Sequence, residues 1–324
     1  MRSWGVELLV AVILILLLLG PPFIYAGGWP PVVSVESPSM EHGSPGVGTL
    51  DVGDLVIIKR VASANDVVTY AEGRATGHST FGEFGDVILF NRPAGGSPII
   101  HRAILWLDYD QASGTWNAPE LLGLANGRDW SRSDGGASPT RIPPGVELRL
   151  LGVRTAGGDI AIALSQLDPV DGFITKGDNI QTNRIIDQHS TNIAPRHPIE
   201  ATQLVGVARG ELPCVGLVTL AIIGKTQYAT SDHATCAVLM IALIVFIGWV
   251  GHTLVVKGVS YARVKRRKSS VGEIEPSRGP ALPPPSPTQL YASPVPEGRR
   301  IAGASRLASR RSAARRAAQR RPRS

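Results

Sequence analysis

Cysteine is scarce in this 324-residue chain: there are only Cys214 and Cys236, and no C-x-x-C motif occurs. Two cysteines without that spacing cannot supply an ordinary metal site, and we predict neither a metal nor a cofactor. The two could pair on an oxidising side of a membrane. Because Cys236 begins an apolar run, we expect instead two unpaired, small apolar side chains.

Positive charge is also scarce in the middle of the chain. Residues 27–233 carry 15 Lys and Arg against 22 Asp and Glu, a net charge of −7. Residues 257–324 carry 17 against 3, a net charge of +14, so the overall +7 belongs to the tail. The basic composition therefore does not predict a nucleic-acid-binding domain, and we expect no specific nucleic-acid partner.

Long helical periodicity and internal repeats are missing from residues 27–233. Short β-type runs recur there, separated by turn clusters rich in Gly and Pro. This pattern predicts a mainly antiparallel β domain over 27–233, with residues 107–172 as an irregular or smaller subdomain. The predicted strands are Leu55–Ile58, Val87–Phe90, Ile99–Trp106, Val146–Val153, Ile160–Leu164 and Leu204–Ala208.

Two long apolar runs flank this region. The first, Val6–Tyr25, is long enough for a membrane span, which needs about 20 residues. A cleaved signal peptide is the alternative, but no clean small-x-small site precedes Gly27, so we predict a retained anchor over 1–26. The second run, Cys236–Val256, predicts a second transmembrane helix over 234–256.

The residues after the second run predict the topology. Lys257 and the basic cluster 263–268 follow it at once, and such residues stay on the cytoplasmic side of a membrane. We therefore expect a two-pass protein of the cell membrane with both termini cytoplasmic and residues 27–233 extracytoplasmic. Residues 257–324 are basic and rich in Pro and Arg, which predicts a disordered cytoplasmic tail. The apolar segment Leu212–Ile223 is too short to span; it could touch the bilayer surface or be an ordinary core segment.

A serine and a histidine provide the first candidates for catalysis. Ser39 stands 14 residues after Tyr25, within reach of the membrane face at a maximum of about 3.3–3.6 Å per residue. A serine hydroxyl needs a base to take its proton. His101 lies in the apolar strand-like run Ile99–Ile104, where desolvation keeps a histidine neutral and able to accept that proton.

Two aspartates could orient such a histidine. Asp178 follows a strand-like run, and Asp187 comes nine residues later. Either carboxylate could reach His101 after the chain turns, in the logic of a serine–histidine–aspartate triad. Gly-Asp-Asn is equally a common turn sequence, so turn chemistry is the alternative for Asp178.

Four segments in order resemble the boxes of type I signal peptidases. They are Ser37-Pro38-Ser39-Met40 after an anchor, Gly85-Asp86-Val87, Ile100-His101-Arg102-Ala103, and Lys176-Gly177-Asp178-Asn179 with Asp187-Gln188. The resemblance covers about residues 1–256 and is to the archaeal and endoplasmic-reticulum type, within it to haloarchaeal members. The bacterial type has a lysine base where this chain has His101, so the resemblance implies a serine–histidine mechanism.

The resemblance implies a role for each site residue. Ser39 is the expected nucleophile, His101 the general base and Asp187 the carboxylate that orients it. Asp178 is expected as a second acid or as structural support, and Ser37 as an aid to the Ser39 amide in holding the oxyanion.

Some residues depart from the pattern or offer alternatives. Pro38 stands where the family usually has Gly. The family often has Pro soon after the Met, but here Met40 is followed by Glu41-His42-Gly43, and we predict that His42 is a loop histidine. Lys59 and Lys176 could be imagined as bases, but we expect a surface lysine at a strand end and a turn lysine. Met40 and the Val32–Val35 region could form an apolar floor under the substrate or simply pack in the core.

The predicted function is that of a membrane-bound serine endopeptidase, a signal peptidase I. Its expected partners are preproteins bearing signal peptides and the lipid bilayer, with the protein translocation channel as a further candidate. One alternative is a related membrane protease with a different substrate. Another is a non-catalytic membrane-anchored envelope or adaptor protein whose basic tail, residues 269–324, binds nucleic acid or ribosomes.

Overall fold

The computed structural model describes residues 4–43, 46–93 and 95–271. The chain divides into two compact units, Met1–Arg267 and Lys268–Ser324. All of the described structure except residues 268–271 belongs to the first unit. Most of the tail that we expect to be disordered, residues 272–324, lies outside the described residues.

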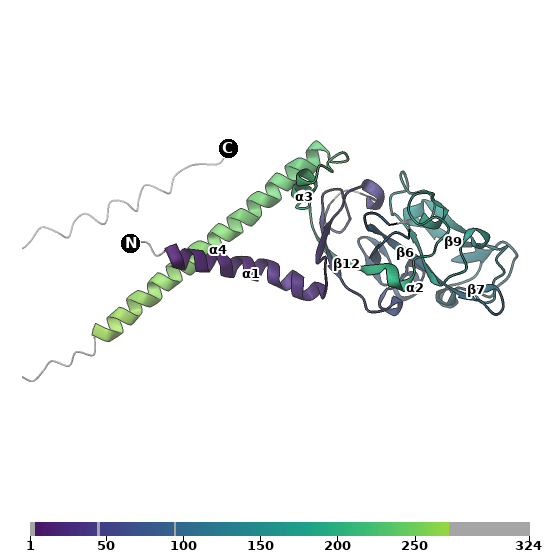
Figure 1. Ribbon diagram of the computed structural model, residues 1–324, viewed down its shortest axis with the longest axis horizontal. Helices are drawn as coiled ribbons and strands as arrows, with labels where there is room; N and C mark the ends of the chain where they lie inside the picture. Colours follow the sequence, from purple (N-terminus) through teal and green to yellow (C-terminus); the bar gives the residue numbers. More distant parts are fainter. Residues whose placement is uncertain (1–3, 44–45, 94, 272–324) are drawn as a thin grey trace, which may run out of the picture. The chain divides into compact units, whose positions relative to one another are not determined.

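The body consists mainly of antiparallel β sheets, which confirms the β architecture predicted for it (Figure 1). Its largest sheet has the order β1-β2-β12-β5-β6-β11, and β7 pairs with the far end of β6. All six runs predicted as strands are strands, four of them in this sheet. The strands of the sheet are β1 Val32–Ser34, β2 Leu55–Lys59, β5 Val87–Phe90, β6 Ile99–Asp110, β7 Thr115–Asn117, β11 Gly172–Lys176 and β12 Leu204–Leu212.

A smaller, three-stranded sheet lies within the region 107–172. It has the order β10-β9-β8, and in β9 the buried Leu148 and Leu150 alternate with exposed or half-buried neighbours, as expected for a sheet with one covered face. Its apolar face joins a core cluster that includes Trp116 and Trp130. The strands are β8 Trp130–Arg132, β9 Glu147–Val153 and β10 Gly158–Ala163, and a two-stranded sheet is formed by β3 Ser79–Thr80 and β4 Glu83–Phe84.

Short helical segments connect the strands. The helix α2, Tyr70–Thr76, begins at the N-cap Thr69, whose hydroxyl accepts a hydrogen bond from the Glu72 N–H, and it ends at Gly77 in the left-handed conformation. The 3₁₀ turns are η1 Pro38–Met40, η2 Ala64–Asp66, η3 Pro119–Gly123, η4 Arg154–Ala156, η5 Leu164–Gln166, η6 Asp187–His189 and η7 Ala201–Gln203.

Both predicted apolar segments are helical. They form α1, Trp4–Ala26, and α4, Ser231–Val271. Among the described residues, one helix segment, Ser231–Ala262, is long and apolar enough to cross a membrane by length and composition. The predicted boundaries of 234–256 were too narrow, since the helix continues through residues 257–271, which we assigned to the disordered tail. Six of these residues are Lys or Arg, which are good helix formers and favour the continuation.

The two cysteines form a disulfide, so the expectation that they are unpaired is wrong. Cys214 follows β12, and Cys236 lies in the first turns of α4, with the two Cα atoms 5.8 Å apart. Between them the chain forms the short helix α3, Leu217–Ile222, and then returns. A cross-link around a loop of 22 residues stabilises a fold by about 3 kcal/mol.

Candidate active site

The turn η1, between β1 and β2, presents Ser39. Pro38 occupies its first position, where its preset φ favours a helical turn and its missing N–H costs no hydrogen bond. The Glu41 N–H closes the turn on the Pro38 carbonyl at 3.1 Å. The Ser37 hydroxyl donates to Ser39 Oγ at 3.2 Å, and Met40 is fully buried beneath them. Met40 therefore packs in a core cluster, one of the two roles considered for it.

Asn179 holds this turn from the other side. Its side-chain Nδ2 donates to the Pro38 carbonyl at 2.7 Å, and its backbone N–H donates to the Ser39 carbonyl at 2.9 Å. Gly177 makes the approach possible, because a Cβ there would lie 2.5 Å from the Ser39 carbonyl oxygen. The strand β11 and the loop after it thus determine where Ser39 sits.

His101 and Asp187 form a hydrogen-bonded pair. His101 is the third residue of β6, opposite Ile88 of β5, and only 2% of its surface is exposed. Its Nδ1 lies 2.7 Å from Asp187 Oδ2. An ionised carboxylate only accepts hydrogen bonds, so the pair assigns the proton to Nδ1 and leaves Nε2 as the acceptor. This is the tautomer that a histidine base requires.

The carboxylate of Asp187 is itself held in place. The Thr175 hydroxyl donates to the same Oδ2 at 2.7 Å. The next residue, Gln188, accepts from the Thr175 N–H at 3.1 Å, so η6 is fixed against β11. Because β11 pairs with β6, the strand that carries His101 also positions the partner of its imidazole.

Ser39 and His101 line the same cavity, with Ser37 beside them. The cavity has a volume of about 510 Å³. Apolar side chains from three strands, Val33, Leu89 and Ile100, make up much of its wall near the serine. A serine, a histidine and apolar side chains thus line one space, which is suited to an extended peptide with small or apolar side chains.

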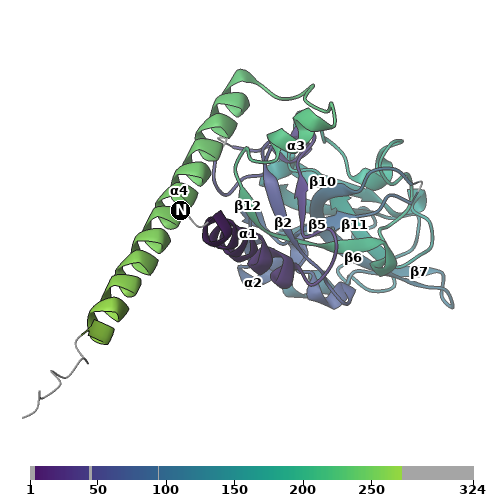
Figure 2. The same ribbon diagram turned by 60° about the vertical axis from the view of Figure 1, so that its left-hand side comes forward.

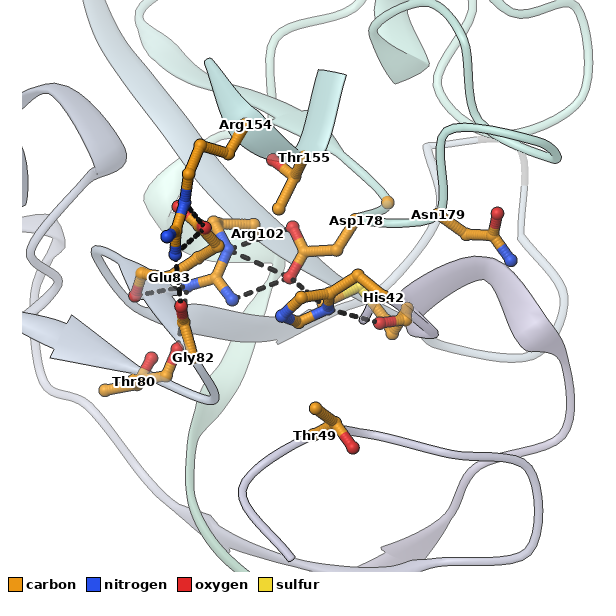
Figure 3. Close-up of polar contacts among 12 residues, drawn as sticks. His42, Thr49, Thr80, Gly82, Glu83, Arg102, Arg154, Thr155, Asp178 and Asn179 are labelled. Atoms are coloured by element: carbon orange, nitrogen blue, oxygen red, sulfur yellow. Dashed lines mark hydrogen bonds and ion pairs between the residues drawn. The ribbon is translucent and has the colours of Figure 1, made fainter. Parts of the chain in front are cut away.

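Asp178 does not contact His101 but forms a buried ion pair with Arg102 (Figure 3). Arg102 Nε lies 2.9 and 3.0 Å from the two carboxylate oxygens, and one terminal nitrogen lies 2.6 Å from Oδ2. The other terminal nitrogen donates to backbone carbonyls, including those of Phe84 and Gly85 at 3.0 and 2.9 Å. Of the two roles expected for Asp178, second acid and structural support, this geometry favours structural support. The buried ion pair fixes Asp178, and the next residue, Asn179, holds the turn that carries Ser39.

His42 lies in the loop after η1, as predicted, and it belongs to the same support. Its Nδ1 lies 3.0 Å from the Met40 carbonyl oxygen and 3.6 Å from Asp178 Oδ2 (Figure 3). Both neighbours are acceptors, so Nδ1 carries a proton and donates. His42 therefore links the residue after Ser39 to the Arg102–Asp178 pair.

The two lysines considered as bases lie elsewhere. Lys59, the last residue of β2, is exposed, as expected for a strand-end lysine. Lys176 is not a turn lysine, because it is the last residue of β11 and is 1% exposed. Its Nζ donates to the carbonyls of Thr155 and Gly177 at 3.2 and 2.7 Å, and burial lowers its pKa. Within the described part of the chain, neither lysine is among the residues that line the cavity of Ser39.

No protein-family model matches the chain, and no curated protein and no solved structure matches it significantly.

The supporting roles of Asn179, Thr175 and Gln188 were not predicted, although Asn179 and Gln188 stand in the segments that carry the resemblance. Their signal was weak, because each acts through a hydrogen bond to a residue remote in the chain or across a loop.

Proposed function

We propose that this protein is a membrane-bound serine endopeptidase, a signal peptidase I, that removes signal peptides from exported preproteins. The observation that supports it best is the Asp187–His101 hydrogen bond of 2.7 Å beside a cavity that His101 shares with Ser39. A nucleophile, a base and a carboxylate that orients the base are the parts that amide hydrolysis by a serine requires.

In the proposed reaction the Ser39 oxygen attacks the carbonyl carbon of the scissile amide. Its proton passes to Nε2 of His101, and the imidazolium that forms is stabilised by Asp187. When the tetrahedral intermediate collapses, His101 gives this proton to the leaving amine. The new N-terminus departs, and an ester on Ser39 remains. Water, deprotonated by His101, then hydrolyses the ester and regenerates the serine.

The oxyanion of the intermediate needs hydrogen-bond donors. The Ser39 N–H lies in the first residues of η1, where backbone N–H groups have no acceptor within the turn. The Ser37 hydroxyl is 3.2 Å from Ser39 Oγ and is a second donor close to the reacting oxygen. Pro38 between them has no N–H, so these two groups are the donors that we assign to the oxyanion.

The strand β1 gives the substrate a place to bind. It is the edge strand of the large sheet, and its residues Val33 and Ser34 line the cavity. An edge strand has unpaired backbone groups that can bind an extended peptide as an added strand. Ser37 and Ser39 follow β1 directly, so a peptide bound along this edge passes the nucleophile.

The proposed location follows from the helices and the disulfide. We assign α1 and α4 as membrane anchors, with the basic residues after Val256 on the cytoplasmic side. The β body then lies outside, together with Cys214 and Cys236, whose disulfide is of the kind that forms in oxidising compartments. This location presents the site to preproteins as they leave the translocation channel.

The test is processing of a preprotein by the full-length protein in membranes. We expect Ser39→Ala and His101→Ala each to lower the cleavage rate by about 10³-fold or more. Ser97→Ala is the matched control, because Ser97 lines the same cavity from an exposed loop and should leave the rate within twofold. Cleavage by Ser39→Ala or His101→Ala at the wild-type rate would show that the proposed mechanism is wrong.

A second experiment separates the proposed function from its alternatives. Mass spectrometry of mature N-termini in cells with and without active enzyme identifies the substrates. Exported proteins of many kinds are expected, whereas one narrow set of surface proteins would indicate a different membrane protease. An adaptor that acts through its basic tail would lose its function on deletion of residues 269–324, while the protease should continue to cleave.

A further inference from the structure

The chain between the two cysteines runs beside the catalytic cavity. This closed segment, Cys214–Cys236, leaves the sheet at the end of β12 and forms α3, which packs against β1 (Figure 2). It contributes Leu220, Ile223 and Tyr228 to the cavity that Ser39 and His101 line. The mechanism described above uses none of these residues.

Four contacts fix the first part of the closed segment to the residues around the nucleophile. The Cys214 N–H donates to Asp54 Oδ1 at 2.8 Å. Gly216 lies against the loop before β2, where a Cβ would be 2.7 Å from the Asp54 carbonyl oxygen and 2.9 Å from Ser34 Oγ. Leu217 packs against Gly53, and Leu220 is fully buried. The segment is therefore an integral part of the site wall.

An ion pair and the disulfide hold the returning part. Lys225 Nζ lies 2.7 and 3.0 Å from the carboxylate oxygens of Glu36, the residue before Ser37. The disulfide then ties Cys236 back to Cys214. Tyr228 lies between these two links in the chain, so both restrict the segment that carries it, and the covalent one is the stronger.

We propose that the closed segment is a specificity-determining wall, held by the Cys214–Cys236 disulfide, that contacts the apolar residues on the N-terminal side of the scissile bond. This inference rests on the proposed function. The N-terminal side of a signal peptide's cleavage site is the side joined to its membrane-embedded apolar core. Tyr228 stands three residues before α4 begins at Ser231, so this wall is the part of the cavity nearest to an anchor in the chain. Its apolar side chains fit that end of the substrate.

The test measures selectivity with the full-length protein in detergent micelles. One substrate set varies Ala, Val and Leu two to four residues before the scissile bond, and a second set makes the same changes after it. Ile223→Ala and Tyr228→Ala remove apolar wall and should change the ratio of kcat/KM between Leu and Ala substrates about tenfold in the first set. In the second set the ratio should change less than twofold.

Ile222→Ala is the matched control. Ile222 is the last residue of α3, directly before Ile223. It is 80% exposed and is not among the residues that line the cavity. It should leave both ratios unchanged. If Ile223→Ala and Tyr228→Ala behave as this control does, or lower kcat/KM equally for every substrate, the wall does not determine specificity.

Removal of the disulfide is an independent test of the same inference. Replacing both Cys214 and Cys236 by serine should weaken the same N-terminal-side discrimination at least fivefold, with Ser39-dependent cleavage retained. Unchanged discrimination in a folded double variant contradicts the role of the disulfide. If the wild type cleaves and Ser39→Ala does not, but none of these selectivity changes appears, the inference about the wall is wrong and the proposed function stands. If no substrate shows cleavage that depends on Ser39, both the proposed function and the inference are wrong.

Discussion

Replacing Asp187 by asparagine should lower kcat/KM by about 10³-fold while leaving the protein folded. When His101 takes the serine proton, the imidazolium faces a carboxylate whose Oδ2 is 2.7 Å from Nδ1. Two unit charges about 4 Å apart attract by about 4 kcal/mol at an effective dielectric constant near 20. Since about 1.4 kcal/mol corresponds to a factor of ten in rate, loss of this attraction predicts a decrease of about 10³.

The assay is single-turnover processing of a preprotein by the purified full-length protein, with Tm measured on the same samples. Asparagine keeps an oxygen that can accept from His101 and Thr175, so Tm should change little. Asp178→Asn is the matched control. It removes the charge partner of the buried Arg102 and should cost about 3–5 kcal/mol of unfolding free energy, with a clear fall in Tm.

The two substitutions thus separate catalysis from support. Below the transition temperature, the folded fraction of Asp178→Asn should retain far more activity than Asp187→Asn. The reasoning is refuted if Asp187→Asn keeps more than a tenth of wild-type kcat/KM. It is refuted equally if both aspartate variants lose the same activity after correction for the folded fraction.

Three further predictions concern other residues of the body. Burial raises the pKa of Glu120 from 4.5 to about 7. Between these two pH values the folded state holds a proton that the unfolded chain releases. The free energy of unfolding should therefore fall by up to about 3 kcal/mol as the pH rises from 4.5 to 7. Glu120→Gln should remove this fall in urea titrations at pH 5 and pH 8, and an unchanged pH dependence would contradict the assignment. His42→Asn keeps a donor near the Nδ1 position and should retain activity, whereas His42→Leu should lose about fivefold in kcat with little change in KM, consistent with one hydrogen bond of about 1 kcal/mol; equal activities would argue against a positioning role. Ser37→Ala should lower kcat by about 10²–10³ at nearly constant KM, as expected for one oxyanion donor, and a purely raised KM would exclude that role.

The strands and the residues on them were predictable because their signal is local. Val87–Phe90 and Ile99–Trp106 are apolar runs bounded by turn residues, and such runs form strands whatever their partners are. His101 was identifiable for the same reason, as a titratable side chain within one of these runs. The order of the boxes then related it to Ser39.

The supporting contacts were not predictable, because they depend on the return of distant segments. Asn179 reaches Pro38 across 141 positions, and Cys214 finds Cys236 only because α3 turns the chain back. Lys176 was assigned to a turn because Gly-Asp-Asn follows it, but it is the last residue of β11 and is buried. Each of these outcomes follows from tertiary packing that overrides a local preference.

The position of β12 in the sheet has a consequence for biogenesis. This strand lies between β2 and β5, and it is the ladder that joins the half of the sheet next to Ser39 to the half that carries His101. Residues 204–212 are synthesised after all three members of the proposed triad. The two halves therefore cannot be joined through the sheet until almost the whole body has emerged, and pairing at such long range is slow. If the proposed function is correct, a newly made chain should therefore have no peptidase activity until β12 is inserted, just before α4 follows it.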